Sequence, residues 1–451
     1  MKDLTQGSIP RLVMAMAIPI AAGMLFQTLY LLVDLYFVAG LGDAPLAGVG
    51  AAANVSMVIV ALTQMLGVGT IALVSHAAGR KDQAEANLIF NQSVLLSAIL
   101  GAVTLVAGYG LTGVYMRSLA ADAPSAAAGA TYLYWYLPGM ALQFAMVAMG
   151  SALRGTGIVK PTLMVQALTV LLNTLFAPVF IAGWGTHHPF GVAGAGFAST
   201  LAIAIGVVFL WMYFAKLEHF VALDPRQWTP RLASWRRILN IGLPAGGEML
   251  MIFVVVAVVY WTIRNFGPAA QAGFGVGSRV MQSIFLPAMA IAFAASPVAG
   301  QNFGAGQVAR VRETFRAAAW MSSGVMAVLG AFCIWRADLL VKLFTSDPPA
   351  IAVAASYLGI VSWNFIATGL VFTCSSLFQA LGNTWPSLLS SGSRLITYVI
   401  PALWMGAHGH FELHHLWYLS VVTVSLQAVF SLLLLQQQFR QRLSLRTTAT
   451  S

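Results

Sequence analysis

Two acidic residues stand inside long apolar stretches of the chain: Asp34 in LLVDLYFVAGLG and Glu248 in GLPAGGEMLMIF. An ionised carboxylate is costly within hydrocarbon, so an acid at membrane depth usually faces a cavity or a polar partner. Such a carboxyl group can load and release a proton near neutral pH, or offer its oxygens to a hard cation such as sodium. The sequence therefore predicts cation binding at Asp34, with a polar tie between helices as the alternative. Glu248 is the weaker candidate, because it lies near the start of its predicted helix and could reach the membrane interface.

Two arginines, Arg279 and Arg394, are also predicted to lie within the membrane. A structural role is favoured for both, in which they neutralise Glu248 or bind backbone carbonyl groups. Glu248, Arg279 and Arg394 are therefore grouped as a second polar site. Uncharged polar side chains at membrane depth more often tie helices together than bind a ligand. The candidates for a substrate cavity are Gln27, Tyr30, Gln64, Gln143 and Gln282.

Nothing in the chain indicates ATP, metal or covalent chemistry. The sequence has no Gly-Lys-Ser/Thr phosphate loop and no evident nucleophile–base constellation. Cys333 and Cys374 lie in apolar segments and have neither metal-ligand nor disulfide spacing. The spacing of the histidines in HGHFELHH, residues 408–415, could hold a metal, but a solvated loop explains them equally well. We therefore expect no enzymatic activity, no cofactor and no bound metal, and a membrane enzyme or assembly factor is the less favoured alternative.

The segments that carry these residues are predicted to be membrane helices. Hydrophobic residues make up 59% of the chain and charged residues 8%, against about 25% charged in soluble domains. A bilayer core of about 30 Å needs about 20 apolar residues per helix. The apolar runs predict an all-α polytopic membrane protein of about twelve helices, over residues 12–40, 45–76, 88–113, 129–152, 161–184, 191–215, 237–265, 272–300, 314–336, 353–379, 386–407 and 416–437.

Glycines and prolines recur along the chain at an offset of 225 residues, half its length. Gly and Pro set bends and close backbone contacts, so a shared offset predicts two pseudo-symmetric halves with one backbone plan. Internal duplication is common in transporters. The recurring pairs include Pro19 and Pro244, Gly42 and Gly267, Gly48 and Gly273, Gly79 and Gly304, and Gly157 and Gly382.

The distribution of lysine and arginine predicts the orientation. With both termini in the cytoplasm, most basic residues fall on the cytoplasmic side, as the positive-inside rule requires. This also explains the net charge of +10 without nucleic-acid binding. The predicted domains are a six-helix bundle over 1–215, a cytoplasmic linker over 216–236 and a second six-helix bundle with a short basic tail over 237–451. We expect the charged linker to lie along the membrane surface.

Several segments resemble the bacterial multidrug and toxic compound extrusion (MATE) family. In the first half they are FQTLYLLVDLYFVAGLG, VSHAAGRKDQAEA, ALRGTGIVKPTL and GVAGAGFAST, and in the second IGLPAGGEMLM, SPVAGQNFGAGQVARVRE and FQALGNTWPSLL. The resemblance covers about residues 8–440 and rests on the order and spacing of these segments. It implies two six-helix bundles and a central cavity that opens alternately to each membrane face. It also implies export of amphipathic, often cationic compounds in exchange for protons or sodium.

The resemblance implies roles for single residues. Asp34 matches the family's coupling carboxylate, Asn173 matches an Asn that joins it in the sodium-binding form of the site, and Ser199 stands where a Thr is usual. That form has an Asp one turn after the Asn, but Ala177 occupies this position here. Because hard cations need oxygen ligands, proton coupling is favoured over sodium coupling. Glu248 matches an acid common in the family's seventh helix.

The predicted function is therefore a proton-coupled antiporter of the bacterial inner membrane. We expect a monomer whose partners are small amphipathic substrates and membrane lipid, with no nucleic acid. One alternative is sodium-coupled drug efflux. Another is a lipid-linked oligosaccharide flippase of related fold, in which Arg279 and Arg394 would suit a pyrophosphate group.

Overall fold

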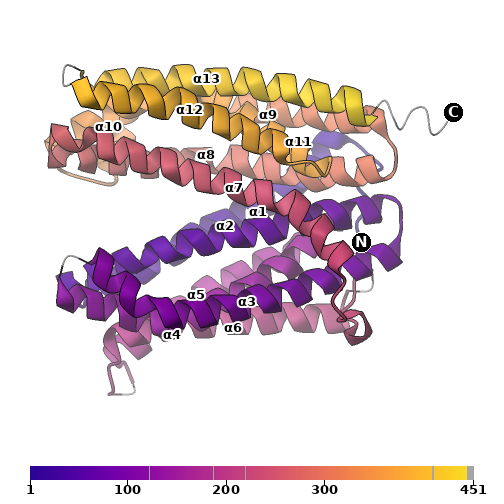
Figure 1. Cartoon of the computed structure of the whole chain (residues 1–451), viewed down its shortest axis with the longest axis horizontal. Coiled ribbons are helices and arrows are strands. Elements are labelled where there is room, and N and C mark those ends of the chain that lie inside the picture. The colour runs from indigo at the N-terminus through magenta and orange to yellow at the C-terminus, as the bar shows by residue number, and fades with distance from the viewer. Residues whose placement is uncertain (121, 186, 219, 409–410, 444–451) are drawn as a thin grey trace. The chain divides into compact units, whose positions relative to one another are not determined.

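The computed structural model describes residues 1–120, 122–185, 187–218, 220–408 and 411–443, most of which lie in helices (Figure 1). In lipid, each backbone N–H and C=O must be bonded within the protein, and a helix meets this need locally. The helices are α1 Ile9–Ala39, α2 Asp43–Gly79, α3 Gln83–Leu119, α4 Ala123–Gly155, α5 Lys160–Ala182, α6 Gly191–Lys216, α7 Leu232–Ile263, α8 Pro268–Gly304, α9 Val308–Lys342, α10 Pro348–Val361, α11 Phe365–Ala380, α12 Trp385–His408 and α13 Leu413–Gln438.

Eleven helical segments of the described chain are long and apolar enough to cross a membrane. One is Pro348–Ala380, where the 3-10 turn Ser362–Asn364 joins α10 to α11. The sequence predicts a single helix there, over 353–379. The eleven do not include α12, whose hydropathy is lowered by Arg394 and several serines. The predicted all-α membrane fold of about twelve helices is confirmed.

The repeat is visible in the backbone that precedes two equivalent helices. Gly42 precedes α2 with φ 110° and ψ −179°, and Gly267 precedes α8 with φ 89° and ψ 176°. Glycine reaches this conformation without the steric cost that a Cβ would add. The same rare backbone geometry at the 225-residue offset supports one backbone plan for both halves.

Close helix contacts also repeat at this offset. Gly48 of α2 packs so tightly against α4 that a Cβ would collide with the backbone at Ser125. Gly273 of α8 packs in the same way on α10, where a Cβ would lie 2.8 Å from the carbonyl oxygen of Ala350. Ser125 and Ala350 are themselves 225 residues apart. Small residues let helix backbones approach closely in membrane proteins, and here they do so at equivalent places.

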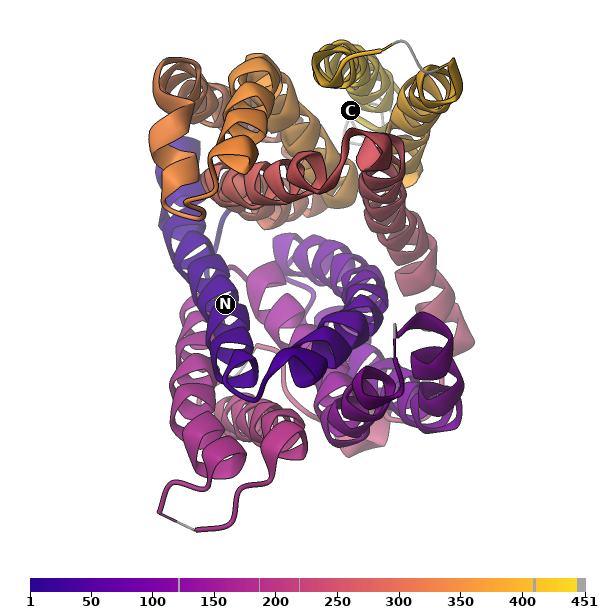
Figure 2. The ribbon, with the colours of Figure 1, turned by 90° about the vertical axis from the view of Figure 1, so that its left-hand side faces the viewer.

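The chain divides by its internal contacts into two compact units. Unit 1 comprises Met1–Asp3 and Ala22–Gly242, and unit 2 comprises Leu4–Ala21 and Leu243–Ser451. Within each unit the helices run roughly along one direction (Figure 1) and form a bundle when seen nearly end-on (Figure 2).

These units differ at their edges from the predicted domains, 1–215 and 237–451. Residues Leu4–Ala21, which include the first part of α1, pack in unit 2, and the Leu4 amide before this helix donates to Oε1 of Gln301 at 3.0 Å. The first part of α7 packs in unit 1, where Ile238 lies against Gly69 of α2. Each of these segments belongs to the unit against which it buries its apolar side chains. Position in the sequence alone does not reveal which unit that is.

The predicted linker over 216–236 is shorter in the structure. Lys216 ends α6 and Leu232 begins α7, so the last residues of the predicted linker belong to a helix. Between them, the 3-10 turn Pro225–Gln227 is capped by Asp224, whose carboxylate accepts from the amide of Arg226 at 3.0 Å. The described part of this segment is hydrogen-bonded to Asn91 and Gln92 of α3 in unit 1.

Candidate cation site

Asp34 lies in α1, and side chains of α4, α5 and α6 converge on its carboxyl group. The Tyr132 hydroxyl donates to Oδ2 of Asp34 at 3.0 Å, and the Ser199 hydroxyl donates to Oδ1 at 3.4 Å. Asn173 of α5 lies beside the same carboxyl group. Asp34 is 6% exposed, and Asn173 and Ser199 are 0% exposed. The three residues predicted for cation coupling are thus brought together around one buried carboxyl group in unit 1.

Small residues of α6 make this convergence possible. A Cβ at Gly196 would lie 2.6 Å from the carbonyl oxygen of Tyr132, so α6 can approach α4 closely only with glycine there. A Cβ at Gly194 would collide with the backbone of Phe180 in α5. The segment GVAGAGFAST therefore sets Ser199 at the distance that its hydrogen bond with Asp34 needs.

The site contains one carboxyl group and several neutral polar atoms. Ala177 is completely buried, one helical turn after Asn173, and its side chain adds no oxygen ligand. Both amide atoms of Asn173 and the Tyr30 hydroxyl are buried without a hydrogen-bond partner of ordinary geometry. Buried polar groups are bonded in the great majority of cases. Asn173 and Tyr30 therefore offer unused donor and acceptor capacity beside Asp34.

Two tyrosines of α4 extend this site, and sequence reasoning missed both. Tyr132 and Tyr136 lie one turn apart on one face of α4, with ring centroids 5.3 Å apart. The Gln143 side chain in turn donates to the Tyr136 hydroxyl at 3.1 Å. The available signal in the sequence was the spacing of Tyr132 and Tyr136 in TYLYWY, which places two hydroxyl groups on one face of a helix. A run of aromatic residues in a membrane helix is also typical of simple packing, so the signal was weak.

The predicted second polar site has partners that sequence reasoning also missed. The Ser375 hydroxyl of α11 donates to Oε2 of Glu248 at 3.0 Å, and Ser387 of α12 donates to Ser375 at 2.9 Å. Ser391, one turn after Ser387, lies beside the same carboxyl group. The serines of SSLFQ and WPSLLSS were the signal, but any membrane helix tolerates serine.

The two arginines grouped with Glu248 have other surroundings. Arg394 is half-buried, and its neighbours in unit 2 include Tyr357 and Tyr398. Arg279 is exposed. Among the described residues no ion pair joins Glu248 to either arginine. Serine hydroxyls therefore take the place that the sequence assigned to a guanidinium group.

The five cavity candidates do not form one cluster. Tyr30 lies one turn before Asp34 on α1, and Gln143 reaches the same site through Tyr136. Gln64 is half-buried on α2, and Gln27 and Gln282 are exposed. Among the contacts of the described residues, those of Tyr30 and Gln143 connect with the Asp34 site.

The histidines of HGHFELHH lie around the last loop between helices. His408 ends α12, and His410 lies outside the described residues. His414 contacts Glu412 through Nδ1 at 3.0 Å, and His415 accepts from the Glu412 amide at 3.1 Å. No group of three or more metal-ligating side chains was found within the described ranges.

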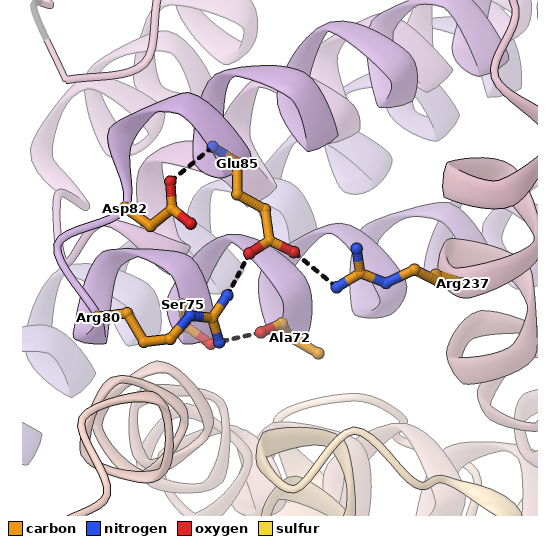
Figure 3. A network of polar contacts seen from close by, with 6 residues as sticks. All are labelled: Ala72, Ser75, Arg80, Asp82, Glu85 and Arg237. Atoms are coloured by element: carbon orange, nitrogen blue, oxygen red, sulfur yellow. Dashed lines mark hydrogen bonds and ion pairs between the residues drawn. The ribbon is translucent and has the colours of Figure 1, made fainter.

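A charge cluster lies where α2 meets α3, in the segment VSHAAGRKDQAEA (Figure 3). Glu85 pairs with Arg80 and also with Arg237 of α7, the latter at 2.7 Å. The Asp82 side chain caps α3 by accepting from the Glu85 amide at 3.0 Å. Arg237 is half exposed, and exposed pairs contribute little to stability. The Glu85–Arg237 pair joins the start of α7 to α3 within unit 1, and none of the residues of this cluster contacts Asp34 among the described residues.

Comparison with known proteins identifies the family to which the chain is similar, and both halves of the chain match it. The MatE family profile matches residues 19–179 and again 244–404, two stretches related by the 225-residue offset. A probable multidrug resistance protein, YpnP of Bacillus subtilis, is 29% identical over 391 residues, which cover 84% of this chain and 86% of that protein. An FAD transporter of Shewanella oneidensis is 23% identical and covers 90% of this chain and 91% of its own length.

Solved structures of similar proteins share this fold. A MATE protein in a bent conformation superposes with a TM-score of 0.92 at 25% identity, covering 98% of both chains. A MOP superfamily transporter from Pyrococcus furiosus gives a TM-score of 0.90 at 25% identity, covering 97% of this chain and 98% of its own. With the two profile matches, these similarities show that the chain belongs to the MatE family of multidrug and toxic compound extrusion transporters.

Proposed function

We propose that this protein exports amphipathic, often cationic compounds in exchange for protons, with Asp34 as the proton-binding group. The observation that carries the proposal is the buried carboxyl group of Asp34 among Tyr132, Ser199 and Asn173. A membrane-buried acid with several polar partners is a typical feature of proton-coupled transporters. The relatives named as multidrug proteins support this class of substrate.

Proton coupling is favoured over sodium coupling by the composition of the site. Sodium is a hard cation and prefers several oxygen ligands, with carboxylates among them. The Ala177 side chain supplies no oxygen ligand, and Asp34 supplies the one carboxylate among the described side chains that meet at this site. A proton needs only a single carboxylate oxygen and an acceptor nearby.

Protonation changes which hydrogen bonds the site can make. The ionised carboxylate accepts from Tyr132 and Ser199. Once protonated, Asp34 becomes a donor, and the Asn173 amide oxygen, which has no other partner, is an available acceptor. This exchange would draw α1 toward α5. A ligand drives a conformational change only by its different affinity for two states, and the exchange of partners supplies such a difference for alternating access.

The proposed membrane location and orientation rest on the apolar helices and on the distribution of basic residues. The apolar helices make this a multi-pass membrane protein, and the lysine and arginine distribution supports a location in the bacterial inner membrane with both termini in the cytoplasm. We propose a monomer that takes substrate from the cytoplasm or inner leaflet and releases it outside.

The test uses purified protein in proteoliposomes loaded with a fluorescent cation such as ethidium. We expect an imposed pH gradient to drive transport without sodium, and a sodium gradient alone to drive none. Asp34→Asn should abolish the pH-driven transport. The matched control is Asp43→Asn, which removes an exposed acid at the start of α2 and should transport at the wild-type rate.

Two results would contradict the proposal. Transport that requires sodium and ignores the pH gradient would replace the proton with sodium as coupling ion. Transport by Asp34→Asn at the wild-type rate and protein level would remove Asp34 from the coupling role.

A further inference from the structure

In unit 1, the chain that follows α6 is held against α3 by two fully buried amides. The Asn91 side chain donates to the carbonyl oxygen of Ala222 at 2.9 Å, and its oxygen accepts from the Trp228 indole at 3.0 Å. The Gln92 side chain donates to the carbonyl oxygens of Gln227 at 2.6 Å and Thr229 at 2.9 Å. This segment covers one face of the α3–α6 pair.

The equivalent place in unit 2 is formed by α9 and α13, and no segment among the described residues covers it. At the 225-residue offset, Asn87 and Asn91 of α3 correspond to Arg312 and Arg316 of α9. Two adjoining cavities of about 210 and 270 Å³ follow α9 here, and we call them together the α9–α13 groove. The groove is lined by Arg312, Phe315, Arg316, Ala319, Trp320, Ser323, Leu370, Leu432, Leu435, Gln436 and Phe439.

An aromatic pair shows the difference between the two places. In unit 1, Phe90 and Phe214 stack with ring centroids 4.5 Å apart, and both rings are buried. In unit 2, their equivalents Phe315 and Phe439 meet edge to face at 6.1 Å, and both are partly exposed. The α3–α6 pair of unit 1 is therefore covered by the segment that follows α6, whereas the described residues of unit 2 leave the equivalent α9–α13 pair uncovered.

The groove is positively charged at one end. Arg312 and Arg316 lie one turn apart on the same face of α9, and both are exposed. Neither forms an ion pair or a hydrogen bond within the described residues. Glu313, an acid next to Arg312 in sequence, does not line the groove. The two guanidinium groups are therefore available to an anion from outside the chain.

Apart from Ser323 and Gln436, the rest of the groove is apolar, and it extends along α9. From Arg312 to Ser323, α9 rises by about 16 Å at 1.5 Å per residue, which is close to the length of a lipid acyl chain. Along this path Trp320 is 80% exposed, and Leu370 and Leu432 are partly buried. The α9–α13 groove therefore has two arginines at one end, which would attract an anionic headgroup, and apolar side chains along its length, which would contact a hydrocarbon tail.

We propose that the α9–α13 groove binds an anionic phospholipid, with Arg312 and Arg316 on its phosphate and an acyl chain along Trp320, Leu370 and Leu432. Basic pockets between membrane helices recognise such headgroups, and arginine pairs bind phosphate through several N–H donors. The proposal concerns lipid and does not depend on the coupling ion.

The test measures quenching of Trp320 by phospholipids with brominated acyl chains, in full-length protein reconstituted into vesicles. Quenching of Trp320 is the difference between wild type and Trp320→Phe. We expect brominated phosphatidylglycerol to displace phosphatidylcholine at this site with a preference on the order of tenfold, because each arginine near the lipid surface adds attraction for the anion. The double variant Arg312→Gln/Arg316→Gln should lose this preference.

A matched control separates the groove from general surface charge. Arg226→Gln/Arg236→Gln removes two exposed arginines that do not line the groove and should keep the preference for phosphatidylglycerol. Equal quenching of wild type by both lipids would overturn the proposal. An equal loss of the preference for phosphatidylglycerol in the groove variant and in the control variant would overturn it as well. A chain ending at Leu443 should behave like wild type. If that truncation instead increases quenching by both lipids, the terminal segment occupies the groove and the proposal fails.

Discussion

The Tyr132 hydroxyl donates a hydrogen bond of 3.0 Å to Asp34, across 98 residues of sequence and between α4 and α1. Tyr132 is 5% exposed and Asp34 6% exposed, so water competes little for this bond. Both residues belong to unit 1, where Ser199 completes the pair of donors to the carboxylate.

Removing this hydroxyl should slow transport. In Tyr132→Phe the ring remains but the carboxylate loses a donor, and a hydrogen bond to a charged group contributes about 1.5–3 kcal/mol. We expect ethidium efflux from energised, efflux-deficient cells to fall on the order of tenfold at unchanged protein level. Tyr134→Phe is the control, because Tyr134 lies on the same helix but is 40% exposed. Equal efflux by wild type and Tyr132→Phe would show that this bond has no part in coupling.

Restoring a second carboxylate should change the ion preference. Ala177→Asp places an acid one turn after Asn173, which lies beside Asp34, and adds oxygen ligands for a hard cation. We expect proteoliposomes with this variant to transport in response to a sodium gradient. Ala177→Asn adds similar volume without the charge and should not gain this response. If both variants respond alike to sodium, the added charge does not explain ion selectivity.

The Ser375–Glu248 bond should contribute to stability in unit 2. Ser375→Ala leaves a carboxyl oxygen without its donor, and an unsatisfied buried group costs about 1–3 kcal/mol. We expect the thermal unfolding midpoint in detergent to fall by a few degrees. Ser425→Ala is the control, because Ser425 is exposed and bonds only the Val421 carbonyl of its own helix among the contacts described. An unchanged midpoint for Ser375→Ala would mean that water replaces the serine without loss.

Two glycines in one helix should respond oppositely to alanine. Gly48→Ala forces a Cβ against the α4 backbone, 2.7 Å from the Gly129 nitrogen, and overpacking of this kind costs about 1–3 kcal/mol. Gly50→Ala meets nothing within 4 Å and should gain about 0.5–1 kcal/mol from helix propensity. Thermal unfolding of the two variants, compared with wild type, measures both effects. Equal midpoints for the two would show that α2 and α4 do not pack as described.

The sequence by itself determined the membrane helices, the duplication and the central acid. Apolar runs of membrane length and the glycine and proline register are local properties, and Asp34 is conspicuous because ionised groups are rare in lipid. The resemblance in motif order added Asn173, Ser199 and the missing acid at Ala177. Asn173 and Ser199 lie beside Asp34, since the family fold fixes which helices are neighbours.

Only the tertiary structure decided the partners of these residues. Tyr132 and Ser375 look like ordinary packing residues in sequence, and their role depends on helix rotation, which hydropathy does not specify. Packing likewise assigned the first part of α1 to unit 2 and the first part of α7 to unit 1. It also placed Arg312 and Arg316 beside the α9–α13 groove, whereas the equivalent residues of unit 1, Asn87 and Asn91, bind Ala222 in the segment that follows α6. Such contacts join residues that are far apart in sequence, so their geometry follows from how the helices pack and not from any local pattern.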